Sequence, residues 1–96
     1  DINKVNKDDC NALYIASEKG HLEIVKLLIE NRIDINKVNK NDCNALYIAS
    51  LKGYLEIVKL LIKNGINKNQ KTKDGRTALD IAREYEHKDI ESFLLV

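Results

Sequence analysis

The feature that most constrains the fold is a direct repeat of 33 residues. Residues 1–33 and 34–66 align without a gap and differ at only five positions, while residues 67–96 continue in the same register but have diverged. A fixed period without insertions indicates that each unit occupies the same volume and stacks on its neighbour. Such a unit cannot bury its apolar face alone, so contacts between units must supply the stability. We therefore expect a single domain over residues 1–96, with repeats at about 1–33, 34–66 and 67–96.

Within the second repeat the pattern predicts two short helices. Asn44 is a favourable N-cap for the first helix, because its side-chain oxygen can accept a hydrogen bond from a first-turn amide. Gly53 ends that helix, since glycine enters the left-handed region without penalty. A second helix is expected over about Leu55–Ile62, with apolar residues around most of its circumference. Asn64-Gly65 then ends it. Both helices are too short to be stable alone, so the array must hold them.

Four segments match a known family closely. They are "GHLEIVKLL" (Gly20–Leu28), "GYLEIVKLL" (Gly53–Leu61), "DGRTALDIA" (Asp74–Ala82) and "IDIN" (Ile33–Asn36). Together with the period, they make the whole chain resemble the ankyrin repeats. The resemblance implies an all-α solenoid of stacked helix-turn-helix units joined by β-hairpin-like fingers. It also implies a module that binds other proteins.

The departures from the ankyrin pattern fall mainly at turns. Gly75 keeps the family's glycine before the first helix, but Asp9 and Asp42 replace it in the other two repeats. Aspartate tolerates a positive φ better than most residues, so the turn is expected to persist. Arg32 stands where Gly65 and the family have glycine. A positive φ at Arg32 should cost roughly 1 kcal/mol.

The two ends of the array differ in polarity. In the third repeat, Lys88 and Glu91 place charges where the other repeats have leucine and valine. This predicts a polar C-terminal cap, which keeps the last repeat soluble. The first repeat has no such change. Either further repeats precede it in a longer parent protein, which is the favoured explanation, or its exposed face stacks on another molecule, with self-stacking of this chain as one form.

No combination of residues predicts catalysis or metal binding. Cys10 and Cys43 occupy equivalent positions, so we expect them roughly 10 Å apart, beyond the Cα limit of about 7 Å for a disulfide. Both thiols are expected to be partly exposed, but neither has a recognisable histidine and acid as partners. The two histidines match the family's structural turn residue, and zinc-ligand spacing is absent. Tyr14 and Tyr47 should pack and hydrogen-bond between repeats. We expect no enzyme activity, no metal and no cofactor.

Charge and hydropathy restrict the class of partner. The formal net charge is +1, which gives no global attraction for nucleic acid or an anionic membrane. No apolar run approaches the roughly 18 residues of a membrane span. A protein or peptide is therefore the expected partner. Free cysteines and the family favour an intracellular, cytoplasmic location.

Lysines recur at equivalent positions, so stacking should arrange them in columns. The columns are Lys7, Lys40 and Lys73; Lys4 and Lys37; and Lys19 and Lys52. The favoured interpretation is a solvated face interleaved with aspartates. The alternative is a surface biased toward an acidic partner.

The resemblance places the partner-binding surface on the finger tips and the solvent side of the first helices. Its predicted residues are Val5, Lys7, Asp8, Cys10, Glu18, Lys19, Val38, Lys40, Asn41, Cys43, Leu51, Lys52, Lys71, Lys73, Asp74, Arg76, Glu84 and Tyr85. Leu51 and Tyr85 form a candidate anchor patch, because Leu51 is expected to be an exposed apolar residue flanked by lysines and near Tyr85. A chance leucine on an unspecialised scaffold is an equal alternative. The alternative function is a structural spacer or engineered repeat scaffold, which the near-identity of the first two repeats favours.

Overall fold

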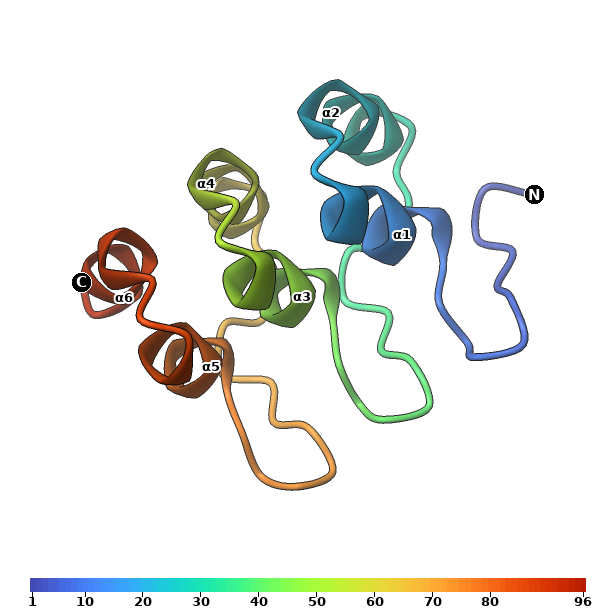
Figure 1. Ribbon diagram of the computed structural model, residues 1–96. Coiled ribbons are helices and arrows are strands. Elements are labelled where there is room, and N and C mark those ends of the chain that lie inside the picture. The colour runs from blue at the N-terminus through green and yellow to red at the C-terminus, as the bar shows by residue number, and fades with distance from the viewer.

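The computed structural model describes residues 1–96 as six α-helices without a β-strand. The helices are α1 (Ala12–Lys19), α2 (Leu22–Glu30), α3 (Ala45–Lys52), α4 (Leu55–Lys63), α5 (Ala78–Glu84) and α6 (Lys88–Leu94). Each repeat contributes one helix pair, and the pairs stand side by side in chain order (Figure 1). The predicted all-α repeat fold is confirmed. None of the six helices combines the length and hydrophobicity that crossing a membrane requires.

Two rows of helices enclose a continuous core. The inner row, α1, α3 and α5, lies next to the loops that project to one side, and the outer row is α2, α4 and α6 (Figure 1). The central helix α3 packs against both α1 and α5, and α4 packs against both α2 and α6. Leu46 and Val58 of the second repeat and Ile90 of the third are each fully buried. Because this core crosses repeat boundaries, no repeat could keep its burial alone.

Local signals begin and end the helices as predicted. Asn44 precedes α3, and its side-chain oxygen accepts a hydrogen bond from the Tyr47 N–H at 3.0 Å. In the third repeat Thr77 and Asp80 form a reciprocal capping box at the start of α5. Gly53 ends α3 in the left-handed region with φ 84°. These short-range bonds satisfy amides and carbonyls that the helices leave free at their ends.

The fingers are the loops that connect one repeat to the next. Neighbouring fingers are joined through the backbone, since Lys40 N–H donates to the Asp8 carbonyl and Lys73 N–H to the Asn41 carbonyl, both at 3.1 Å. Within the second finger, the Asn39 side-chain oxygen accepts a hydrogen bond from Asn41 N–H at 2.9 Å. The fingers are therefore hairpin-like, but side-chain bonds to the backbone shape their turns in place of a regular strand ladder.

The third repeat carries the expected polar end. Lys88 is exposed, and Glu91 is half-buried and paired with Arg83, whose Nε lies 3.0 Å from the Glu91 carboxylate. Arg83 stands where Ser50 is fully buried in the second repeat. The ion pair thus places charge at the end of the stack, at the two positions where the second repeat has the uncharged, buried residues Ser50 and Val58.

Four residues other than glycine have positive φ. Asp9, Arg32 and Asp42 have φ of 63°, 63° and 62°, as predicted from the glycines that they replace. Glu86 has φ 59°, and it stands in the third repeat where the other two have the glycine that ends the first helix. Backbone strain is therefore stored at repeat turns, where the stacked helices force the chain to reverse.

Replacing Arg32 with glycine should raise the free energy of unfolding by about 1 kcal/mol. An L-residue in the left-handed region carries about 1–2 kcal/mol of strain, and glycine's greater freedom in the unfolded chain offsets part of the gain. Urea unfolding followed by circular dichroism measures the change. Glu30→Lys is the matched control, because it copies the neighbouring difference between the repeats without altering the backbone, and should stay within about 0.5 kcal/mol. An Arg32→Gly variant no more stable than this control would contradict the strain.

Candidate binding surface

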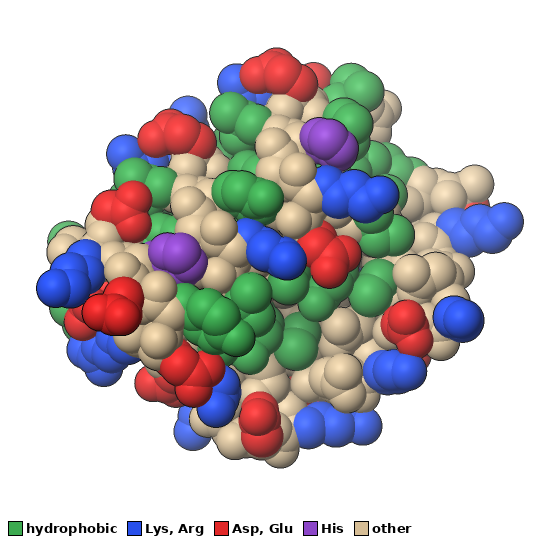
Figure 2. All heavy atoms as spheres, in the orientation of Figure 1, with side chains coloured by type: hydrophobic (Ala, Val, Ile, Leu, Met, Phe, Trp, Pro, Cys, Tyr) green, Lys and Arg blue, Asp and Glu red, His purple; other side chains and the backbone are tan.

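The predicted surface residues lie on the fingers and the inner helices, and their exposure differs. Exposed are Lys7, Glu18, Lys19, Lys40, Asn41, Lys52, Lys71, Lys73, Asp74, Glu84 and Tyr85; half-buried are Val5, Asp8, Val38, Leu51 and Arg76; buried are Cys10 and Cys43. On the face shown in Figure 2, hydrophobic side chains gather over the ends of α3 and α5. Charges of both signs surround them. The inner helices thus bring together an apolar area with a mixed polar rim.

Leu51 and Tyr85 are linked by a third residue, His87. The Tyr85 ring is 52% exposed and stacks on the imidazole of His87, with centroids 6.5 Å apart and planes 12° from parallel. The Leu51 carbonyl in turn accepts a hydrogen bond from His87 Nε2 at 2.9 Å. The Tyr85 ring is therefore supported by an imidazole that is tied to the end of α3. Ordering of this kind lowers the entropy that the side chain would lose on binding.

The cysteines differ from the sequence-based expectation. Cys10 is 8% exposed and Cys43 is 9% exposed, so the expected partial exposure is wrong for both. Each sulfur turns inward toward the backbone of its own finger, where Cys43 Sγ lies 3.8 Å from the Asn41 carbonyl oxygen. Burial raises the pKa of both thiols, which therefore stay protonated at neutral pH. Both are free, without a disulfide.

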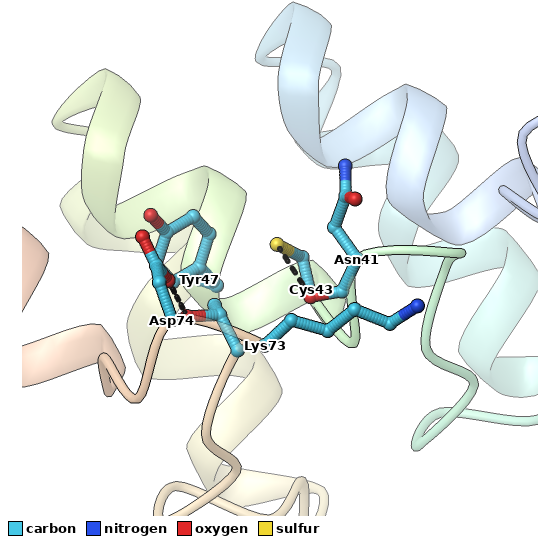
Figure 3. A pocket seen from close by; sticks show the side chains of 6 residues that line it. Asn41, Cys43, Tyr47, Lys73 and Asp74 are labelled. Carbon is cyan, nitrogen blue, oxygen red and sulfur yellow. Dashed lines mark hydrogen bonds between the residues drawn. The ribbon is translucent and has the colours of Figure 1, made fainter.

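Two equivalent pockets lie between neighbouring fingers and the inner helices. The pocket between the second and third repeats has a volume of about 380 Å³ and is drawn in Figure 3. Asp74 is hydrogen-bonded there to the Thr72 hydroxyl, while the Lys73 side chain extends away from Asp74. The pocket between the first two repeats, of about 310 Å³, is lined by Cys10 and Tyr14 at the matching positions. Both hollows are shallow and mixed in polarity, which suits polar peptide groups better than an enclosed apolar ligand.

The fold and the comparison with family models agree. A model for ankyrin repeats, in three copies, matches residues 1–72 and again 33–96, and so spans the whole chain. The chain belongs to the ankyrin repeat family. Ankyrin repeats are generally protein–protein interaction modules without enzymatic activity. A comparison with curated proteins found no match.

In this ankyrin repeat chain, one substitution between the repeats changes the charge of the finger tips. Lys40 Nζ pairs with the Asp8 carboxylate of the preceding finger at 2.8 Å. The hydrogen bond and charge of Lys40 lower the pKa of Asp8, which stays ionised. At the next junction Asn41 replaces Asp8, and no carboxylate lies within ion-pair distance of Lys73. Within the lysine column, Lys40 is therefore the paired member, while Lys7 and Lys73 have no carboxylate within ion-pair distance.

The tyrosines of the inner helices are packing residues. Tyr14 and Tyr47 are half-buried, and burial raises the pKa of each, so both phenols are neutral at physiological pH. Polar contacts between the ankyrin repeats also come from the helix caps. Asn44 Nδ2 donates to the Asn67 carbonyl of the third repeat at 3.1 Å. One asparagine thus caps a helix and holds the next finger, a dual role that the sequence pattern did not predict.

His87 was also absent from the predicted site, although it joins the two patch residues. The sequence signal available for it was its position, because His87 occupies the slot of His21 and Tyr54 in the ankyrin turn.

No group of three or more histidine, cysteine, aspartate or glutamate side chains is arranged to hold a metal ion. The surface thus presents an exposed aromatic ring, hydrogen-bonding groups and charged side chains.

Proposed function

We propose that this ankyrin repeat chain is a non-catalytic module that binds a protein or peptide through its finger tips and the inner helices. The observation that carries the proposal is the ordered patch of Leu51, His87 and Tyr85. A large aromatic ring half-exposed on a rigid support is a typical anchor of a protein interface. The polar rim around it would exclude water and set the orientation of the partner.

An acidic partner fits the charges of the finger tips best. Lys73 has no carboxylate partner, whereas Lys40 is held by Asp8 and Arg76 by Glu84 at 2.6 Å. In the column of Lys7, Lys40 and Lys73, a partner's carboxylate would therefore find unpaired cations at the first and third fingers. We further propose that all three repeats act as one domain and that the protein works inside the cell. Self-association through the first repeat would use a face separate from this surface.

A structural spacer is the second candidate function. It is favoured by the five differences in 33 positions between the first two repeats, because a recognition surface usually diversifies. Two of those differences fall on the proposed surface, however, and both have consequences there. One leaves Lys73 without the carboxylate that pairs with Lys40 in the preceding finger. The other replaces a charged side chain with the half-buried, apolar Leu51.

Selection of a displayed random peptide library against the chain tests the proposal. The expected result is enrichment of peptides that combine acidic residues with an aromatic or aliphatic residue. In fluorescence anisotropy, Leu51→Arg and Tyr85→Ala should each weaken binding of the synthetic peptide at least tenfold, about 1.4 kcal/mol. Affinity should also fall as salt rises, because exposed charges are screened.

Ser92→Arg is the matched control, since it introduces the same cation at an exposed position of the outer helix α6. It should leave peptide affinity unchanged. If selection enriches no peptide, the spacer function gains support and the binding function is lost. If the selected peptides bind all of these variants with equal affinity, the patch of Leu51, His87 and Tyr85 is not their binding site. The binding function would then lie elsewhere on the surface.

A further inference from the structure

The two pockets between the fingers carry different charges, although the fingers that form them are nearly identical. The charged residues that line the pocket between the first two fingers, the first-junction pocket, are Asp8, Glu18 and Lys40. In the pocket between the second and third fingers, the second-junction pocket of Figure 3, they are Lys73 and Asp74. The first pocket thus holds two carboxylates against one ammonium, whereas the second holds one of each. The second is therefore the better match for an anionic group of a partner.

One substitution decides whether the lysine of each junction is paired. At the first junction the Asp8 carboxylate lies 2.8 Å from Lys40 Nζ. At the second junction Asn41 replaces that aspartate, and Lys73 has no carboxylate within ion-pair distance. The backbone is the same at both, because each lysine N–H donates to the carbonyl of Asp8 or Asn41 at 3.1 Å. The difference in charge pairing therefore comes from the side chain and not from a shift of the finger.

The second-junction pocket presents hydrogen-bond donors that are free within the chain. Besides the Lys73 ammonium, the Asn41 side-chain amide lines the pocket, and only the backbone of this asparagine is hydrogen-bonded. Asp74 is held by the Thr72 hydroxyl and lies 3.9 Å from Arg76 Nε, and the Lys73 side chain extends away from it (Figure 3). A carboxylate that enters the pocket can therefore accept charge-assisted hydrogen bonds from groups that no residue of the chain uses.

We propose that the second-junction pocket is the subsite for an aspartate or glutamate side chain of a bound peptide, and that Asn41 determines this preference. An asparagine at this position leaves Lys73 open to the peptide, whereas an aspartate, as at position 8, would occupy it. Lys7 is also unpaired, but it lines neither pocket and so offers only an exposed charge. The subsite belongs to the proposed peptide-binding function and depends on it.

Asn41→Asp tests the subsite, because it copies the first junction into the second. The probe is an acidic peptide from the library selection, amidated at its C-terminus so that only side-chain carboxylates remain. In fluorescence anisotropy at low salt, this variant should bind the peptide about fivefold more weakly, since Lys73 is then paired within the chain. Asp8→Asn is the matched control, because it frees Lys40 and removes a carboxylate, and its affinity should not fall. Circular dichroism melting should show both variants folded, since each carries the residue that the neighbouring finger already has.

Changes in the peptide show whether the effect is a direct contact. Replacing its acidic residues one at a time with the matching amide should weaken binding to the parent chain about fivefold at one position. The same change should have no effect on binding to Asn41→Asp, because the two sites are coupled. Equal losses with both chains, parent affinity in Asn41→Asp, or selected peptides without acidic residues would overturn the subsite while leaving the proposed function intact. If selection enriches no peptide, the subsite and the proposed function fall together.

Discussion

Replacing Leu46 with alanine is expected to lower the free energy of unfolding by about 3–5 kcal/mol. Leu46 lies on α3 and is completely buried. Because α3 packs against α1, α4 and α5, a cavity there weakens both repeat junctions at once. A domain of this size has a total stability of about 5–15 kcal/mol, so the variant should be substantially unfolded at moderate temperature.

Urea unfolding followed by far-ultraviolet circular dichroism measures this loss. Two leucines provide graded controls for the same chemical change. Leu79 holds the equivalent position in α5 and is half-buried, so Leu79→Ala should cost less than Leu46→Ala. Leu95 is 58% exposed, so Leu95→Ala should stay within about 0.5 kcal/mol. Equal losses at Leu46 and Leu79 would mean that the central position holds the array no more strongly than the capping repeat.

Replacing Gly53 with alanine is expected to cost about 2–3 kcal/mol, while the same change at Gly65 should cost about 1 kcal/mol. Both glycines have similar positive φ, 84° and 87°, so the backbone strain on the new side chain is nearly equal. Their surroundings differ. A Cβ at Gly53 would lie 2.7 Å from His87, whereas nothing lies within 4 Å of one at Gly65. The imidazole must therefore move, which breaks its hydrogen bond to the Leu51 carbonyl.

A double-mutant cycle isolates the contact between the methyl group and the imidazole. In a His87→Ala background, Gly53→Ala should cost no more than Gly65→Ala does. The cycle with Gly65→Ala and His87→Ala should be additive, because these sites share no contact. A Gly53→Ala penalty that persists without the imidazole would show that the strain is local to the turn. The ring would then play no part in holding the second and third repeats together.

The helix boundaries and the turns of the fold could be predicted from the sequence. The period of 33 residues, the asparagine caps and the glycine stop at Gly53 are all local or periodic signals, and each predicted the element that the structure contains. Arg32 and Asp42 were placed at positive φ by comparison with the glycines of other repeats, and the structure agrees. Such predictions succeed because the controlling interactions span only a few residues. Equivalent positions in a repeat also share one backbone conformation.

The surface was less predictable. Cys10 and Cys43 were expected to be partly exposed, yet the fold of each finger turns both thiols inward. The sequence predicted that Leu51 and Tyr85 lie in one patch. It did not predict that His87 stacks on the Tyr85 ring and bonds to the Leu51 carbonyl. The free charge at Lys73 likewise depends on Asn41, a residue of the preceding finger. Each of these outcomes involves atoms from two repeats, or the path of a loop through space.

The sequence by itself determined that this chain folds as a stack of equal helix pairs with a polar end. The reason is that each repeat contains its own helix-capping residues and apolar residues at helical spacing, and that these recur every 33 residues. Only the tertiary structure decided which side chains of neighbouring repeats meet. It set the Tyr85 ring on His87 and placed the His87 imidazole over Gly53. The physical reason is that these contacts depend on how one repeat is seated on the next, and that seating is fixed by the packed core as a whole.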